Sequence, residues 1–291
     1  MELGIFVQLL VAGLGIGSIY ALVALGLVLA FKGTGVLNFA QGDLVAFGAY
    51  VALFLSLLKL PYWQVLLGTL AIAAVFGVLL ERTLIRPLLN APAFTVVVAT
   101  LAIGLMIKNA LRLSWQENIA TLPSPLDGVT VRVGDVSVNP QYFWIIGCSI
   151  AIMILLAVFF RRTLIGKAMK AVAQNRDAAR LMGVRVNRVF PLTFAVSTAV
   201  AALAGVLIAP ITGIQSEMGS VIIKGFVAAI LGGFNSLPGC VVGGLVLGTL
   251  ETFGGAFFGG TFKDVTAFVL LIVVLLVRPN GIFGGAEARR V

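Results

Sequence analysis

Residues 5–31 read IFVQLLVAGLGIGSIYALVALGLVLAF, an apolar run that contains no charged side chain. A helix needs about 20 mostly apolar residues to cross the hydrocarbon layer of a membrane, and this run is long enough. No basic segment precedes it and no cleavage site follows it, so we expect a retained membrane helix and not a removable signal peptide. The run therefore predicts a chain that folds in lipid.

Similar apolar runs recur along the chain, bounded by charged residues, Pro or Gly. They cover residues 5–31, 36–58, 62–80, 93–113, 142–160, 190–214 and 262–277. A less regular stretch at 221–253, broken at 235–239, is interpreted as two shorter spans. The sequence therefore predicts one all-α polytopic membrane domain over residues 1–291, with about eight or nine transmembrane helices.

The composition excludes most soluble classes of protein. Charged residues make up 11% of the 291 residues, against roughly 25% in an average soluble domain. Hydrophobic residues make up 60%, and the mean hydropathy is +1.12. Such a chain cannot cover its outside with side chains that suit water, which excludes soluble enzymes, secreted disulfide scaffolds and disordered tails. The net charge of +9 is concentrated in loops, so we expect no nucleic-acid partner.

The side chains needed for metal binding or catalysis do not gather in this sequence. There is no His, the commonest metal ligand and the usual acid–base group near neutral pH. Cys148 and Cys240 lie far apart in apolar runs, as buried small side chains do, and no paired carboxylates occur within a span. We therefore expect no metal, no cofactor and no catalytic site.

The distribution of Lys and Arg predicts the orientation, because basic loops stay on the cytoplasmic side. With the amino terminus outside, 14 of the 20 basic residues fall in inside loops, and eight of these lie at 161–189. We assign this loop to the cytoplasm and expect a multi-pass protein of the bacterial inner membrane. The outside loop at 114–141 carries two β-branched runs about Gly134-Asp135, which predicts a small extracytoplasmic β-hairpin.

Two segments share the same spacing of Gly, Asn and Gly. Residues 35–42 read GVLNFAQG, and residues 232–239 read GGFNSLPG. Transporters are commonly built from duplicated halves whose interrupted helices meet near the membrane midplane and bind the substrate there. We therefore expect an internal repeat, with chance agreement among the 34 Gly as the alternative.

Polar side chains crowd at one end of the span 36–58, namely Asn38, Gln41 and Asp43. The spacing of three puts Asn38 and Gln41 on one face of a helix. Polar side chains are costly in lipid and usually face the protein interior or a water-filled path. These three residues and Asn235 are our candidates for the substrate path. Hydrogen bonds between helices that only hold the bundle together are the alternative.

A few other charges lie at or near the ends of spans. Snorkelling to the interface explains Lys224 and Asp264 without any function. Glu251 lies deeper in its span, but one Glu is too little for a proton relay.

The basic loop at 161–189 is expected to form an exposed helical elbow. Apolar residues recur at helical spacing between its lysines, and Asn175 or Asp177 is suited to cap a second short helix that ends at Gly183. A basic amphipathic helix can lie on anionic lipid. The small side chains that follow Asp177 instead favour insertion into a groove on another protein.

The loop carries a family resemblance. Its Asp177-Ala178-Ala179-x-x-x-Gly183 resembles the Glu-Ala-Ala-x-x-x-Gly loop of ABC importer permeases, which forms the coupling helix that docks on the ATPase subunit. Asp replaces Glu here, and the downstream Ile-x-Leu-Pro is not evident. Together with the two Gly-Asn-Gly segments, the chain is similar over nearly its whole length to the branched-chain amino acid permease family, LivH-type. The resemblance implies that Asp177, Ala178, Ala179, Arg180 and Gly183 couple the permease to an ATPase.

The resemblance also implies the partners. They are two cytoplasmic ATPase subunits, a second homologous permease subunit and a periplasmic substrate-binding protein that delivers an amino acid. The residues agree with an ATPase on a separate subunit. The phosphate-binding motif G-x-x-x-x-G-K-[ST] does not occur, since Gly166-Lys167 is followed by Ala168.

We therefore expect a transport subunit without enzymatic activity of its own. It would carry branched-chain or other hydrophobic amino acids by alternating access. An importer permease for urea or short amides, and an ion-coupled secondary transporter, are the alternatives.

Overall fold

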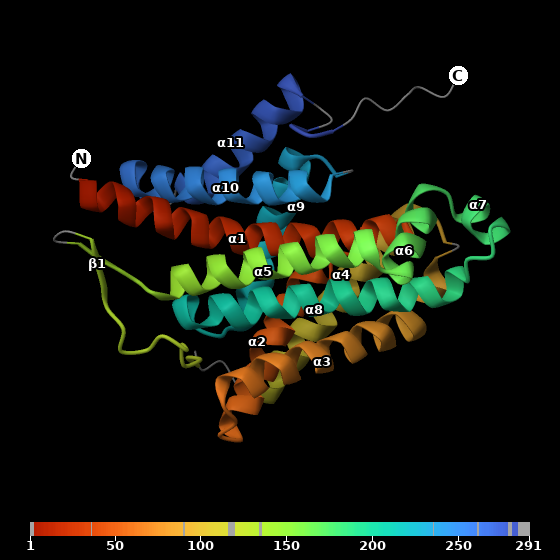
Figure 1. The fold of residues 1–291 in the computed structure, drawn as a ribbon, viewed down its shortest axis with the longest axis horizontal. Coiled ribbons are helices and arrows are strands. Elements are labelled where there is room, and N and C mark those ends of the chain that lie inside the picture. The colour runs from red at the N-terminus through yellow and green to blue at the C-terminus, as the bar shows by residue number, and fades with distance from the viewer. Residues whose placement is uncertain are drawn as a thin grey trace.

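The protein is a helical bundle with one two-stranded sheet, as the computed structural model in Figure 1 shows. The structure describes residues 3–35, 37–89, 91–115, 120–133, 136–234, 236–260, 262–278 and 281–284. The long helices are α1 (Leu3–Thr34), α2 (Gln41–Leu57), α3 (Tyr62–Leu80), α4 (Ala93–Trp115), α5 (Gln141–Arg162), α8 (Val186–Thr212), α10 (Leu237–Phe258) and α11 (Phe262–Val277). Shorter ones are α6 (Leu164–Gln174), α7 (Arg176–Leu181), α9 (Val221–Gly232), the π-helical turn η1 (Glu81–Ile85) and the 3-10 turns η2 (Arg86–Leu88) and η3 (Ser216–Ser220). The predicted helical class is confirmed.

Within the described part of the chain, six helices are long and apolar enough to cross a membrane. They are α1, α3 with its continuation to Leu88, α4, α5, α8 and α10. The predicted eight or nine crossings are not confirmed, because α2, α9 and α11 have only 17, 12 and 16 residues. The apolar runs at 62–80 and 262–277 coincide with α3 and α11, whereas the run at 36–58 becomes helical only from Gln41.

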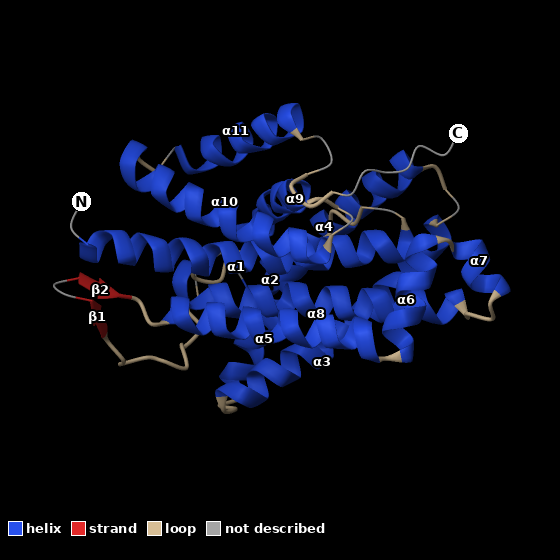
Figure 2. Cartoon of the chain, turned by 45° about the horizontal axis from the view of Figure 1, so that its top comes forward, coloured by secondary structure: helices blue, strands red, loops and turns tan. Residues whose placement is uncertain are grey.

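The short strands β1 (Val131–Val133) and β2 (Val136–Val138) pair antiparallel, with Val131 opposite Val138. This confirms the predicted hairpin, whose turn at 134–135 lies outside the described residues. Gln8 of α1 donates to the Ser137 carbonyl at 3.2 Å. Figures 1 and 2 both place the hairpin beside the start of α1, at the end of the bundle opposite α7.

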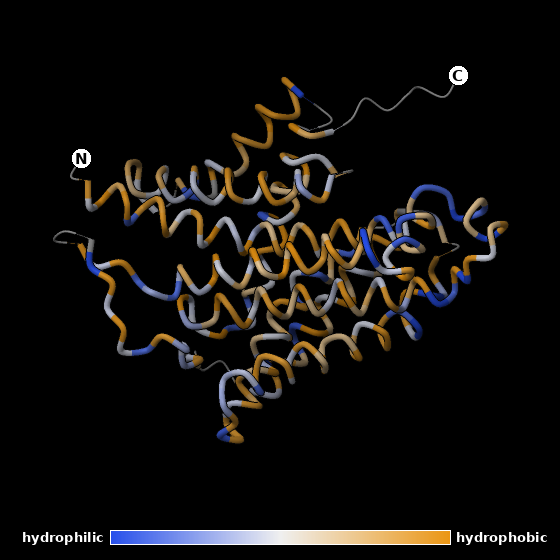
Figure 3. Tube along the Cα trace, in the orientation of Figure 1, coloured by the Kyte–Doolittle hydropathy of each residue, from blue (hydrophilic) through white to orange (hydrophobic). Residues whose placement is uncertain are grey.

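The two ends of the bundle carry different side chains. All three Trp lie at the hairpin end, where Trp63 begins α3, Trp115 ends α4 and Trp144 lies in the first turn of α5. The Trp144 indole donates to the Tyr62 hydroxyl at 3.0 Å. Tryptophan and tyrosine gather where a membrane meets water. Hydrophilic segments around α6 and α7 mark the other end in Figure 3, so the two ends match two membrane interfaces.

The helix α1 is the core of the bundle. Every residue from Ser18 to Ala30 is buried, between α8 on one side and α9 and α10 on the other. Backbones meet at Gly17 of α1 and Gly248 of α10, since a Cβ added on Gly248 would overlap the Gly17 Cα. Small residues of this kind let membrane helices pack closely.

The outer helices turn large apolar side chains away from the bundle. Examples are Phe94 and Met106 of α4, Leu155 of α5 and Leu276 of α11, each more than half exposed. Water would solvate such a surface poorly, whereas lipid chains cover it without cost. The burial pattern therefore agrees with the composition.

Candidate functional site

The segment between α1 and α2 turns back into the bundle. Gly35 has a positive φ of 72°, and the chain reverses after α1 ends at Thr34. Gln41 then begins α2 in contact with Gly26 of α1. Gly26 lies eight residues before Thr34, which is about 12 Å at 1.5 Å per residue. The helix α2 therefore starts inside the bundle, where irregular backbone is tolerated only if protein buries it or it lines a cavity.

The fully buried Gln41 side chain joins three helices. Its Nε2 donates to the Ser197 carbonyl of α8 at 3.0 Å, and its Oε1 lies 3.0 Å from the Ser197 hydroxyl. The same hydroxyl lies 2.7 Å from the Gly26 carbonyl of α1. The Gln41 side-chain amide thus forms its hydrogen bonds with other groups of the protein. This favours the alternative in which Gln41 only holds helices together.

The position of Asn38 differs from the predicted helix face, because α2 begins only at Gln41. The Asn38 Oδ1 accepts from the Ala40 amide at 3.2 Å, and its carbonyl accepts from the Gln41 amide at 3.2 Å. The Phe39 amide donates to the Thr100 hydroxyl of α4 at 3.2 Å. Buried Asn38 therefore shapes the turn that leads the chain into α2.

Asp43 lies in the first turn of α2, between α4 and η3. An added Cβ on Gly104 of α4 or on Gly219 of η3 would meet its carboxylate oxygens, so both backbones approach it closely. Its charged neighbours are Lys108 and Glu217, whose ammonium and carboxylate are 2.7 Å apart. Three charges from three elements thus gather where the partial helix α2 begins, and the helix dipole favours the carboxylate there.

The fourth predicted path residue, Asn235, lies outside the described residues. Its neighbours make different contacts from those of the first segment. Gly239 in the first turn of α10 packs on Gly232 at the end of α9, whereas Gly42 in the first turn of α2 packs on Gly219 just before α9. The internal repeat stays a prediction.

The basic loop folds into two capped helices, which we call the elbow (residues 163–184). The Thr163 hydroxyl caps α6 by accepting from the Gly166 amide at 3.0 Å. Asn175 caps α7, since its Oδ1 accepts from the amides of Asp177 and Ala178, each at 3.0 Å. The predicted short helix with an Asn cap is confirmed.

Gly183 ends α7 in the left-handed conformation, with a φ of 84°. Its amide donates to the Arg180 carbonyl, and the Val184 amide donates to the Ala179 carbonyl, both at 3.0 Å. This pair of bonds is the Schellman arrangement that closes a helix with Gly. Nothing lies within 4 Å of a Cβ added at Gly183, so the conformation and not the space requires Gly.

The residues predicted to couple the elbow to an ATPase do not all face outward. Asp177, Ala178, Arg180 and Gly183 are exposed, whereas Ala179 is buried. Two side chains that the motif does not include are the most exposed large apolar ones of the elbow, Leu181 at 88% and Met182 at 85%. In the sequence they are recognisable as two large apolar residues directly before Gly183, the residue that ends the helix. Helical periodicity alone does not single them out.

Arg176 connects the elbow to the bundle. Its guanidinium lies over the Phe190 ring of α8, 5.2 Å from the centroid. A Cβ added at Gly35 would come 3.0 Å from the Arg176 Nη2. The guanidinium therefore also packs on the start of the segment between α1 and α2. This contact is not predictable from the sequence, because Arg176 and Gly35 are far apart in the chain.

Lys224 is not explained by snorkelling. Its ammonium lies 2.5 Å from the Glu251 Oε1 of α10 and 5.8 Å from the centre of the Tyr20 ring of α1. The Glu251 side chain is almost fully buried. The pair therefore ties α9 to α10 inside the bundle, where each charge alone would be costly.

A family model and several curated relatives assign the chain to one family. The family model described as "Branched-chain amino acid transport system / permease component" matches residues 9–277. The chain is 34% identical to the high-affinity branched-chain amino acid transport system permease protein BraD of Pseudomonas aeruginosa, over 98% of both chains. It is 33% identical to LivH of Escherichia coli, also over 98% of both. Among solved structures, PsaBC from Streptococcus pneumoniae in complex with Fab has a similar fold, with a TM-score of 0.55 and 17% identity over 96% of this chain and 94% of that one.

Proposed function

Because the chain belongs to the family of branched-chain amino acid transport permease components, we propose that it is the membrane subunit of an ATP-driven importer for branched-chain or other hydrophobic amino acids. Its partners are two cytoplasmic ATPase subunits, a second homologous permease subunit and a periplasmic substrate-binding protein. The assembly lies in the bacterial inner membrane, with the elbow in the cytoplasm and the hairpin outside.

The observation that carries this proposal is the exposed tip of the elbow. Leu181 and Met182 project from a short helix that is capped at both ends and surrounded by basic residues. Exposed apolar side chains on a rigid short helix suit a groove on another protein. We infer that Asp177, Ala178, Arg180 and Gly183 shape this docking surface, and that Ala179 anchors it to the bundle.

The coupling route follows from the Arg176 contacts. Closure of the ATPases on ATP moves the elbow, and Arg176 transmits the movement to Phe190 of α8 and to Gly35. Gly35 begins the segment that leads into α2. Displacing this segment tilts α2 against its neighbours and exposes the path first to one side and then to the other, as alternating access requires.

The substrate path is proposed at the start of α2. Asp43, beside Lys108 and Glu217, is positioned to meet the charged groups of an amino acid, while Asn38 shapes the turn and Gln41 fixes α2 to α1 and α8. Asn235 is proposed to take the matching place in the second segment. We expect the walls of this path to be mostly apolar. Such walls suit brief contact with the aliphatic side chain of the substrate, because tight binding would slow release of the substrate.

A reconstituted assembly tests the proposal. We expect proteoliposomes that hold both permeases, the ATPases and the loaded binding protein to accumulate leucine when ATP is present. Leu181→Ser with Met182→Ser should abolish uptake and ATPase stimulation, whereas Val129→Ser, in the loop at the opposite end, should leave both unchanged. Accumulation by the permease without ATPases, under a proton or sodium gradient, would overturn the proposal in favour of a secondary transporter.

A further inference from the structure

Two hollows adjoin at the elbow end of the bundle. One lies beside Lys32 and Gly33 of α1, and the other, of about 530 Å³, opens between α1, α5 and α10. Both are lined by Leu29, Phe160, Lys170 and Leu237, and we call the two adjoining hollows the groove.

The walls of this groove are apolar over most of its length. On α5 they run from Met153 to Arg161, which is eight residues or about 12 Å. Leu25 of α1 and Val241 of α10 line the same stretch. A groove of this length along the helices matches several methylene groups of an acyl chain.

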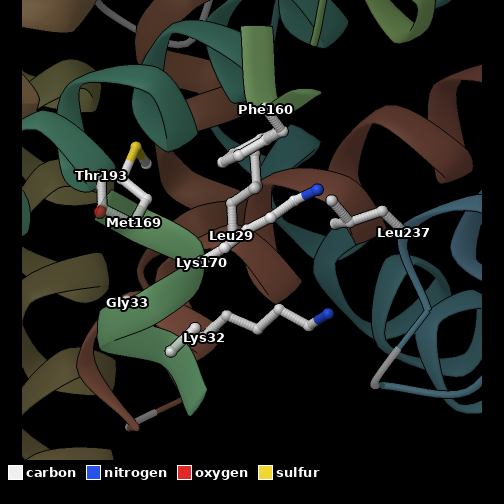
Figure 4. A pocket seen from close by; sticks show the side chains of 9 residues that line it. Leu29, Lys32, Gly33, Phe160, Met169, Lys170, Thr193 and Leu237 are labelled. Atoms are coloured by element: carbon white, nitrogen blue, oxygen red, sulfur yellow. The ribbon is translucent and has the colours of Figure 1, made fainter. Parts of the chain in front are cut away.

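The mouth of the groove is basic. Figure 4 shows the side chains of Lys32 and Lys170 extending in the same direction, with both ammonium groups toward the side where Leu237 lies. Arg161, in the last turn of α5, lines the larger hollow. Among the described residues that line either hollow there is no carboxylate. Lys32 and Lys170 thus line the smaller hollow, and Lys170 and Arg161 line the larger one.

We propose that this groove binds an anionic phospholipid of the cytoplasmic leaflet. The phosphate lies between Lys32, Lys170 and Arg161, and an acyl chain follows the groove between α5 and α10. Basic residues beside membrane helices on the cytoplasmic side attract anionic lipid head groups. Phosphatidylethanolamine fits less well, because its own ammonium would lie among three cations. The assignment to this leaflet rests on the proposed orientation.

The site gives the lipid a place next to the elbow. Lys170 lies on α6, so the bound phosphate would join the elbow to the ends of α1 and α5. The lipid is therefore a ligand that holds α6 on the bundle.

Native mass spectrometry of the purified full chain tests the proposal. The protein is released from mixed micelles that hold phosphatidylglycerol and phosphatidylethanolamine in equal amounts. We expect one phosphatidylglycerol to be retained, and Lys32→Gln with Lys170→Gln to weaken its retention at least about tenfold, since each basic contact near a membrane surface contributes substantially. The control is Arg162→Gln with Lys167→Gln, which removes the same charge from α5 and α6 outside the groove.

Two further arms keep the test decisive. Ala157→Phe fills the apolar part and should lower retention while the basic mouth stays intact. Inorganic phosphate at millimolar concentration should not displace the lipid. The proposal would be overturned if the Lys32→Gln, Lys170→Gln variant retained phosphatidylglycerol as well as the control variant does. Equal retention of phosphatidylglycerol and phosphatidylethanolamine, or displacement of the lipid by inorganic phosphate, would overturn it too. These measurements need neither ATPase nor amino acid, so their failure is distinct from failure of the proposed transport function.

Discussion

Gly183→Val is expected to weaken docking of the ATPase subunits on the elbow, and with it uptake, while the protein still inserts and folds. Gly183 closes α7 with a φ of 84°, and its amide and the next one satisfy carbonyls of the last helical turn. A Cβ added at this position has no neighbouring atom within 4 Å, so the expected effect comes from the backbone conformation.

The size of the effect follows from that conformation. A left-handed backbone costs a residue with a Cβ roughly 1–2 kcal/mol, and valine is among the less tolerant residues. The helix α7 has six residues, too few to be stable without its caps. The penalty therefore falls on the docking shape of the elbow, whose population drops about 5- to 30-fold. The apparent affinity for the ATPase falls by the same factor.

The assay titrates purified ATPase subunits against the permease pair in proteoliposomes and records both ATP hydrolysis and uptake. For Gly183→Val, the ATPase concentration at half-maximal uptake should rise about 5- to 30-fold. For Gly183→Asn, this ATPase concentration should rise much less, because Asn tolerates the left-handed conformation.

The matched control is Gly128→Val, in the loop at the hairpin end. Gly128 has the same φ of 84° and equally open surroundings. It should leave the titration unchanged. Normal coupling in Gly183→Val, or an equal defect in Gly128→Val, would refute the reasoning.

Three other substitutions probe the bundle through melting in detergent and the yield of folded protein. Glu251→Ala should destabilise the protein by roughly 3–5 kcal/mol because it breaks the buried ion pair with Lys224. Glu251→Leu with Lys224→Met should recover most of this, and a double variant no better than Glu251→Ala would contradict the pairing. Gln41→Leu should cost about 1–3 kcal/mol through its lost hydrogen bonds, whereas unchanged melting with lost uptake would assign the amide to the ligand. Gly48→Val should give little folded protein because its side chain would overlap the backbone of α8, while Gly147→Val, in open space, should fold normally.

Much of the helical framework was predictable because lipid imposes a simple length requirement. The apolar run at 262–277 became α11 with both ends correct, and the Asn175 cap and Gly183 terminus of α7 followed from local hydrogen bonding. These features depend on residues close together in the chain, which a sequence displays directly.

The interior of the candidate site was not predictable in the same way. The run at 36–58 predicts a helix from its start, yet residues 37–40 are irregular, since burial in protein suits both helix and turn. In the sequence alone, Gln41 fits both a substrate path and a hydrogen bond between helices, and its contact with Ser197 favours the second. Lys224 fits an interfacial lysine in the sequence, whereas the structure places it beside Glu251. Partners distant in sequence decide these roles.

The most direct test of the account is a cross-link from the tip of the elbow. Met182→Cys, in a chain with Cys148→Ala and Cys240→Ala, carries a photoactivated cross-linker in the reconstituted assembly. The account predicts a covalent product with an ATPase subunit, and protection of this cysteine from thiol reagents when the ATPases are present. A cysteine that labels equally with and without ATPases, and that cross-links only to lipid, would contradict it.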